Sequence, residues 1–230
     1  MEIEELGQAP ATNHDRVSGP DTDDGHGNES FPEARMNVGM ASNLYLGLVH
    51  HPIYGKRGEV VATAITNFDI HDIARCAKTF GVGGFFIITP LESQVQLAER
   101  IIRHWVEGSG SVYNPTRKES FSLIRISRTI DEADREISDL WQKKAKRVAT
   151  GASPHPKNID FGFLKKLLRE ENNPFFILFG TGWGLTQEVK DRSDYVLAPI
   201  EGKGYNHLSV RSAVAIILDR LLGERINSSE

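Results

Sequence analysis

The chain has 230 residues, of which 39% are hydrophobic, and its formal net charge at pH 7 is −4. This length is enough to bury one full core, and the sequence contains neither an apolar run long enough to cross a membrane nor a secretory signal pattern. We therefore expect a soluble, cytoplasmic protein without a membrane partner. The single cysteine, Cys76, excludes an internal disulfide, and it indicates no zinc site because no second cysteine or histidine cluster accompanies it.

The first 42 residues differ in composition from the rest of the chain. They carry nine acidic residues against two arginines and show no periodic apolar pattern, so burial cannot offset the entropy of ordering them. We predict a disordered acidic tail over residues 1–42 and one folded domain over residues 43–230. The domain carries three more basic than acidic residues, which permits a polyanionic partner. Met36 and Met40 are alternative starts to Met1.

From residue 43 onward, short apolar runs alternate with amphipathic stretches. The apolar runs predict strands at 44–50, 83–89, 122–127, 147–150, 175–179 and 195–199. The amphipathic stretches predict helices near 70–80, 92–106, 130–142, 160–170 and 208–222. Strands separated by helices indicate an α/β fold with a mostly parallel sheet flanked by helices. In such folds ligand sites lie at the carboxyl ends of the strands.

Three consecutive predicted strands end in glycine-bearing loops. The loops are TGAS (150–153), GTGWG (180–184) and APIEGKGYNHLS (198–209). Glycine after one strand is ordinary turn chemistry, whereas three such loops in succession favour a ligand site built from main-chain groups. Neither a phosphate-loop lysine nor a dinucleotide fingerprint accompanies the glycines, which disfavours a different α/β enzyme that uses a nucleotide.

The last two of these loops resemble motifs of a known family. The stretches FGTGWGL and APIEGKGYNHLSVRSAVAIILDRL are similar to the second and third motifs of the SPOUT superfamily of RNA methyltransferases. The segment DIHDIARCAKTFGVGGFFIITP (69–90) resembles the first motif of the ribose 2′-O branch, and the glycine signature also resembles the tRNA guanine-N1 branch. The chain resembles more closely a bacterial group of SPOUT proteins that are described only as RNA methyltransferases. The resemblance implies a carboxyl-terminal trefoil knot, S-adenosylmethionine as cofactor, tRNA or rRNA as partner, and a homodimer.

The first motif supplies the catalytic candidates, and two assignments stay open. Arg75 stands where the ribose-methylating branch has its arginine, but Asp69 and His71 replace the asparagine and glycine of that branch. For a ribose acceptor Arg75 would orient or deprotonate the hydroxyl; for a base nitrogen Asp69 would accept the proton. From spacing alone, Arg75 is equally an exposed residue on a solvated helix face and Asp69 a helix N-cap.

The cofactor candidates come from the resemblance and from the chemistry of the loops. S-adenosylmethionine has no phosphate, so main-chain N–H and C=O groups exposed by glycine can bind its adenine and ribose edges directly. Trp183 either walls the adenine pocket or packs as a buried residue, and Asn206 and Ser209 either bind the cofactor or cap the last helix. The resemblance places the cofactor on Thr150, Gly151, Gly180, Thr181, Gly182, Trp183, Gly184, Ile200, Gly202, Tyr205, Asn206, Leu208, Ser209 and Ser212.

The remaining polar groups give weaker signals. The histidines lack the spacing of zinc ligands, so no metal is expected. The loop 50–60 either presents Tyr54, Lys56 and Arg57 to RNA phosphate or forms an ordinary surface turn. Leu218 and Leu222 are expected to face a partner subunit. The sequence therefore predicts an S-adenosylmethionine-dependent methyltransferase acting on a base or ribose of tRNA or rRNA. The alternative is a catalytically inactive knotted protein that binds RNA.

Overall fold

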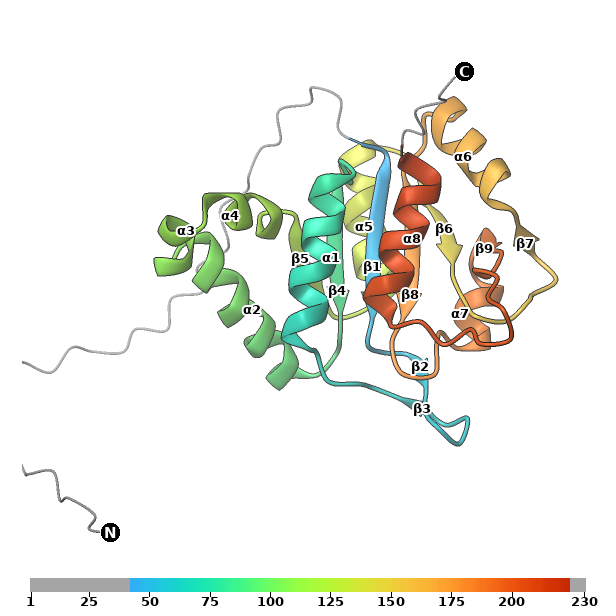
Figure 1. Cartoon of the computed structure of the whole chain (residues 1–230), viewed down its shortest axis with the longest axis horizontal. Coiled ribbons are helices and arrows are strands. Elements are labelled where there is room, and N and C mark those ends of the chain that lie inside the picture. Colours follow the sequence, from blue (N-terminus) through green and yellow to red (C-terminus); the bar gives the residue numbers. More distant parts are fainter. Residues whose placement is uncertain (1–41, 224–230) are drawn as a thin grey trace, which may run out of the picture. The chain divides into compact units, whose positions relative to one another are not determined.

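The computed structural model describes residues 42–223, so the predicted acidic tail lies outside the described residues except for its last position. Parallel strands form the main sheet in the order β5-β4-β1-β8-β6-β9-β7 (Figure 1). Their bounds are β1 Leu44–Val49, β4 Gly84–Ile88, β5 Ile124–Ser127, β6 Lys146–Ala149, β7 Asn158–Ile159, β8 Phe175–Gly180 and β9 Tyr195–Leu197. A separate hairpin pairs β2 (Ile53–Tyr54) with β3 (Val60–Val61) in antiparallel fashion.

The central strands explain why the sequence reads as continuous apolar runs. Every residue of β1 is buried, and β1 pairs with β4 on one side and β8 on the other. A parallel strand covered on both faces loses the alternation of polar and apolar residues, since neither face meets water. The six predicted strands and the parallel α/β architecture are confirmed. Strands β2, β3 and β7 were not predicted, because two residues are too few to leave a pattern.

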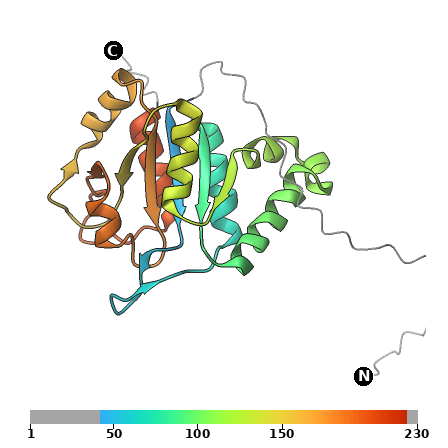
Figure 2. The same ribbon diagram turned by 180° about the vertical axis from the view of Figure 1, so that it is seen from behind.

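Helices cover both faces of the sheet. In Figure 1, α1 (Asn67–Thr79) and α8 (Val210–Leu222) lie in front of it, and α2 (Glu92–Val106) and α6 (Phe161–Glu170) contribute to the same buried cluster. Figure 2 shows α5 (Ile130–Trp141) on the opposite face, where α7 (Gln187–Asp191) also contributes to the core. The five predicted helices are confirmed. The short helices α3 (Ser109–Tyr113), α4 (Pro115–Phe121) and α7 were missed, because five to seven residues show too little periodicity.

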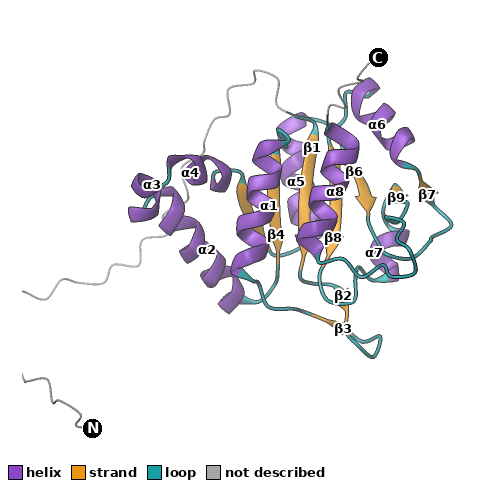
Figure 3. Cartoon of the chain, in the orientation of Figure 1, coloured by secondary structure: helices purple, strands orange, loops and turns teal. Residues whose placement is uncertain are grey.

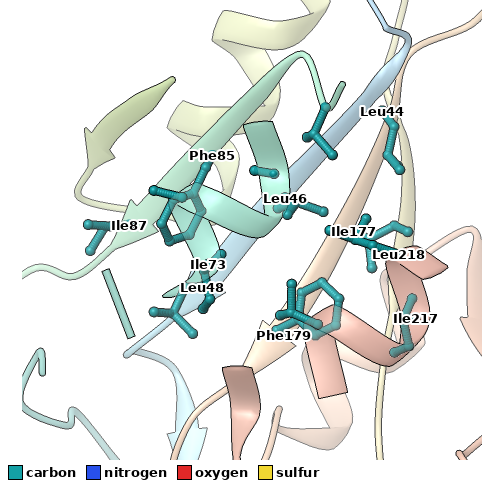
Figure 4. Close-up of a cluster of buried hydrophobic side chains, with 14 of the residues drawn as sticks. Leu44, Leu46, Leu48, Ile73, Phe85, Ile87, Ile177, Phe179, Ile217 and Leu218 are labelled. Carbon is teal, nitrogen blue, oxygen red and sulfur yellow. The ribbon is translucent and has the colours of Figure 1, made fainter. Parts of the chain in front are cut away.

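The core on the first face explains the position of α8. Its side chains Ile217 and Leu218 pack towards Ile177 and Phe179 of β8 (Figure 4). Leu218 is 0% exposed, so the expectation that it faces a partner subunit is wrong: its own sheet already covers it. Leu222, at the end of the helix, is half-buried and packs against the same cluster.

Helix α1 begins and ends through local side-chain and backbone chemistry. Thr66 is the N-cap, because its hydroxyl oxygen accepts a hydrogen bond from the Asp69 N–H at 3.2 Å. The Thr66 hydroxyl also donates to the Asp69 carboxylate at 2.7 Å, so the expectation that Asp69 is itself the N-cap is wrong by three residues. The helix ends at Phe80, and Gly81 adopts a φ of 67°, the left-handed conformation that follows many helices.

Candidate functional site

The sheet order brings the three glycine loops together. Strands β8, β6 and β9 are neighbours and parallel, so the loops that follow them emerge at the same edge of the sheet (Figure 3). The Asn206 side-chain amide donates to the Ala152 carbonyl oxygen at 3.1 Å, which joins the loop after β9 to the loop after β6. Asn206 therefore fastens two loops, and the alternative that it caps α8 is wrong, since Ser209 is the N-cap.

The β2–β3 hairpin lies against the loop after β8. The Tyr54 N–H donates to the Gly184 carbonyl at 2.9 Å, and the Trp183 N–H donates to the Tyr54 carbonyl at 3.1 Å. The Tyr54 hydroxyl accepts the Gln187 N–H at 3.0 Å, and Ile53 forms a β-bridge with Leu185. The hairpin thus covers one side of the GTGWG loop. The sequence did not reveal this contact, because it joins segments that are far apart in the chain.

Two positions of that loop require glycine because neighbouring parts of the chain leave no room for a side chain. Gly182 has a φ of 55°, and a Cβ added there would lie 2.6 Å from Cδ1 of Ile53. A Cβ at Gly180 would overlap the backbone N–H of Leu185. The side of Gly182 that a side chain would occupy therefore faces the hairpin, so the hairpin by itself requires glycine at this position.

The predicted cofactor side chains divide into structural and exposed groups. The Thr150 hydroxyl donates to the Leu178 carbonyl at 2.9 Å, and Ile200 packs against the first core cluster. Trp183, Tyr205 and Leu208 are exposed at 63%, 72% and 45%, so the alternative of Trp183 as a buried packing residue is wrong. The other predicted positions, Gly151, Gly184, Gly202 and Ser212, lie in or directly after the same three loops, with Ser212 in the first turn of α8.

The two catalytic candidates lie at different places on α1. Oδ1 of Asp69 is 3.5 Å from Nη1 of Arg211 in the first turn of α8, and Arg211 also approaches Asp72 at 3.4 Å. Arg75 is exposed and lies six residues further along α1, about 9 Å along the helix axis from Asp69. The structure therefore brings Asp69 to the predicted cofactor segment 206–212 and leaves Arg75 at a distance from it.

A buried chain of side-chain hydrogen bonds also reaches the GTGWG loop. His50, which is 0% exposed, contacts the Thr63 hydroxyl through Nδ1 at 3.0 Å, and that hydroxyl contacts the Thr181 hydroxyl at 2.6 Å. Burial lowers the pKa of His50 to about 4, and the nearby Asp69 carboxylate opposes this shift. Sequence reasoning considered His50 only as a metal ligand, and no group of three or more potential metal ligands occurs within residues 42–223.

Comparisons with known proteins give a matching family model and similar sequences. A model of the family of S-adenosylmethionine-dependent RNA methyltransferases matches residues 43–223. A protein of Oleidesulfovibrio alaskensis named tRNA (guanine-N(1)-)-methyltransferase is 44% identical over 187 residues, which are 80% of this chain and 43% of that protein. An uncharacterized protein of Aquifex aeolicus is 37% identical over 183 residues, 78% of this chain and 88% of that one.

A solved structure shares the fold. A probable methyltransferase from Bordetella pertussis superposes with a TM-score of 0.54 at 14% identity, over 78% of this chain and 94% of that structure. The chain spans less than half the length of the named Oleidesulfovibrio relative. Among the described residues, no helix is both long and apolar enough to span a bilayer.

The match over residues 43–223 shows that this chain belongs to the family of S-adenosylmethionine-dependent RNA methyltransferases.

Proposed function

We propose that this chain binds S-adenosylmethionine at the edge formed by the loops 150–153, 180–184 and 198–209 and transfers its methyl group to RNA. The observation that carries the proposal is the adjacency of β8, β6 and β9, which gathers all three glycine loops of the sequence at one edge of the sheet. Membership of the methyltransferase family supports the same reading.

The residues at this edge fit such a cofactor. Trp183 and Tyr205 present exposed aromatic surfaces, which suit a planar adenine ring, and the loops offer main-chain donors and acceptors around them. When bound, the cofactor supplies a methyl group activated by a sulfonium centre. The work left to the protein is to align the acceptor atom and to remove or mask its proton.

Asp69 is better placed than Arg75 to hold that proton within one chain. Its carboxylate is nearly buried and joins the first turn of α8 through Arg211, beside the proposed cofactor segment. A carboxylate at this position serves a base nitrogen that must lose its proton, and we therefore propose a nucleobase of tRNA or rRNA as the acceptor. A ribose acceptor, with Arg75 as the orienting group, is the competing assignment.

Two substitutions distinguish the acceptors. For a base nitrogen, Asp69→Asn lowers single-turnover methylation by about 10² or more while Arg75→Ala has a mild effect. For a ribose hydroxyl the order is reversed, and Arg75→Lys rescues little, because an ammonium cannot reproduce the planar guanidinium fork. Full activity in both Asp69→Asn and Arg75→Ala would refute any role of this motif in the chemistry.

Transfer itself separates an enzyme from the inactive RNA-binding alternative. The protein is incubated with S-adenosylmethionine labelled in its methyl group and with bacterial tRNA and rRNA isolated from cells lacking the gene. Label in the RNA supports the proposed activity, and nucleotide mapping then identifies the position. Cofactor and RNA binding without any transfer would support the inactive alternative.

Three further properties belong to this proposal. We propose that this chain, like the superfamily that it resembles, forms a carboxyl-terminal trefoil knot and a homodimer. The exposed Phe68 of α1 and Leu208, which precedes α8, support a partner surface next to the proposed site. An RNA substrate of this kind would place the enzyme in the cytoplasm.

A further inference from the structure

The tip of the β2–β3 hairpin carries two cations that the protein does not use internally. Lys56 and Arg57 are exposed, and within residues 42–223 neither forms an ion pair. The one neighbouring acid, Glu59, uses its carboxylate to accept the Arg57 N–H at 2.8 Å. The turn is closed by the Gly55 N–H, which donates to the Glu59 carbonyl at 2.8 Å. The hairpin therefore holds two unpaired positive charges beyond the sheet edge where the proposed cofactor loops emerge (Figure 1).

The base of the same hairpin is fastened to the GTGWG loop by a directed chain of hydroxyl groups. The Thr181 hydroxyl donates to the Val49 carbonyl at 3.0 Å, so its single proton is used there. The Thr63 hydroxyl must then donate to Thr181, and His50 must donate to Thr63 from Nδ1. Every proton in the chain has a defined position, and His50 is fixed as the neutral tautomer that carries its proton on Nδ1. The low pKa of His50 agrees with this neutral form.

Main-chain contacts of strand β2 reinforce the attachment. Tyr54 exchanges two backbone hydrogen bonds with Trp183 and Gly184, while Gly182 packs closely on Ile53. A shift of the hairpin therefore displaces the loop, because the backbone hydrogen bonds and the Gly182–Ile53 contact would be lost if the hairpin or the loop moved alone. The hairpin and the proposed cofactor loop are therefore expected to move together.

We propose that the β2–β3 hairpin is an arm that binds the phosphate backbone of the RNA substrate, and that its attachment to the GTGWG loop couples RNA binding to cofactor binding. This inference rests on the proposed function, since it assigns the GTGWG loop to the cofactor. Coupling of this kind is reciprocal: whatever factor the cofactor adds to RNA affinity, RNA adds to cofactor affinity.

The arm is tested by removing its charges. The probes are unfractionated bacterial tRNA and S-adenosylhomocysteine, the demethylated product, which binds without reacting. In the Lys56→Ala, Arg57→Ala double variant we expect tRNA affinity to fall and the slope of log affinity against log salt to decrease by about 2, one unit for each lost phosphate contact. Affinity for S-adenosylhomocysteine alone should stay unchanged.

The control removes two exposed charges at the opposite ends of the strands; of these, Lys143 also donates to the Asn172 carbonyl oxygen at 2.7 Å, so its variant is checked for unchanged thermal unfolding. Lys143 and Lys144 are exposed and precede β6, so they lie at the amino ends of the strands. Lys143→Ala, Lys144→Ala should leave the salt slope unchanged. An equal loss in both double variants, or no loss in the hairpin variant, would overturn the assignment of the arm.

The coupling is tested through the hydroxyl chain. In the unmutated protein, saturating S-adenosylhomocysteine should raise tRNA affinity by about five-fold or more, the lower end of typical coupling. Thr63→Val removes the hydroxyl at constant shape and should reduce this ratio towards one, whereas Thr63→Ser should keep it. Tyr54→Phe, which removes only the contact to the Gln187 N–H, should reduce the ratio in part even if Thr63→Val folds poorly.

The outcomes separate this inference from the proposed function. If S-adenosylhomocysteine binds but leaves tRNA affinity unchanged in the unmutated protein, the coupling is refuted and the cofactor site stands. If S-adenosylhomocysteine does not bind the unmutated protein at all, both the site and the coupling fail. The salt dependence of tRNA binding by the hairpin variant is measured without cofactor, so it tests the arm whether or not S-adenosylhomocysteine binds.

Discussion

Arg211 in the first turn of α8 lies 3.5 Å from Asp69 in the first turn of α1, and its guanidinium also stacks on the Phe68 ring at 5.6 Å. The pair joins the predicted first motif to the predicted third motif, although the two are separated by most of the domain sequence. It places the acid proposed to take the acceptor's proton beside the segment proposed to hold the cofactor.

Replacement of Arg211 by Gln should affect binding more than stability. The Arg211 side chain is partly exposed, and the nearly buried Asp69 keeps the hydrogen bond from the Thr66 hydroxyl when the pair is lost, so the free energy of unfolding should fall by only about 1 kcal/mol. Loss of the pair frees the first turn of α8, so cofactor affinity should fall several-fold while the melting temperature changes little. Titration calorimetry and thermal unfolding measure the two effects. A large drop in melting temperature with unchanged affinity would contradict this role.

Gly182→Val should disrupt the GTGWG loop for two separable reasons. The residue has a φ of 55°, which is strained for a β-branched side chain by about 1–3 kcal/mol, and the added atoms would meet Ile53. Gly81→Val is the matched control, because its φ is 67° but no atom lies within 4 Å of an added Cβ, and it lies outside the three proposed cofactor loops. Chemical unfolding should show a larger destabilisation for Gly182→Val, and calorimetry should show loss of cofactor binding only there. Equal effects would mean that contact with the hairpin is unimportant.

His50 should make the protein less stable in mild acid. Its folded-state pKa of about 4 lies below the ordinary value of 6.5, so the unfolded chain takes up the proton first as the pH falls. The stability that His50 contributes is fully present above pH 6.5 and is lost progressively towards pH 4, by roughly 3 kcal/mol in total. His50→Asn keeps a donor for Thr63 but cannot titrate. Urea unfolding between pH 4 and 7 should show a steeper dependence for the parent than for His50→Asn, and parallel curves would disprove this account.

If the homodimer forms through the surface beside α1 and α8, substitutions of exposed and of buried residues should have different effects on association and stability. Phe68 is 71% exposed, so Phe68→Asp should weaken association by at least ten-fold in light scattering while leaving the monomer folded. Leu218 is buried in the monomer, so Leu218→Ala should lower the free energy of unfolding by about 2–5 kcal/mol without a direct effect on association. A parent protein that stays monomeric at micromolar concentration would rule out the dimer.

The sequence by itself determined the elements with strong patterns. Buried parallel strands such as Phe175–Gly180 read as continuous apolar runs, and α1 shows its buried stripe of Ile70, Ile73, Ala74 and Ala77 at helical spacing. These patterns are local, because each depends on which side of one element faces the core. The succession of strands and helices then fixed the parallel α/β class, and the resemblance of the late motifs fixed the family.

The tertiary structure decided which residues meet. Leu218 was expected to face a partner subunit, but α8 contacts α1 and α6 as well as β8, and the side chain is fully buried. Gly182 was expected only as a cofactor position, yet the space beside its Cα is occupied by Ile53 from a hairpin that the sequence did not predict. The His50–Thr63–Thr181 chain and the Arg211–Asp69 pair join distant segments in the same way. Contacts of this kind depend on strand order and loop path, which residue type and spacing do not encode.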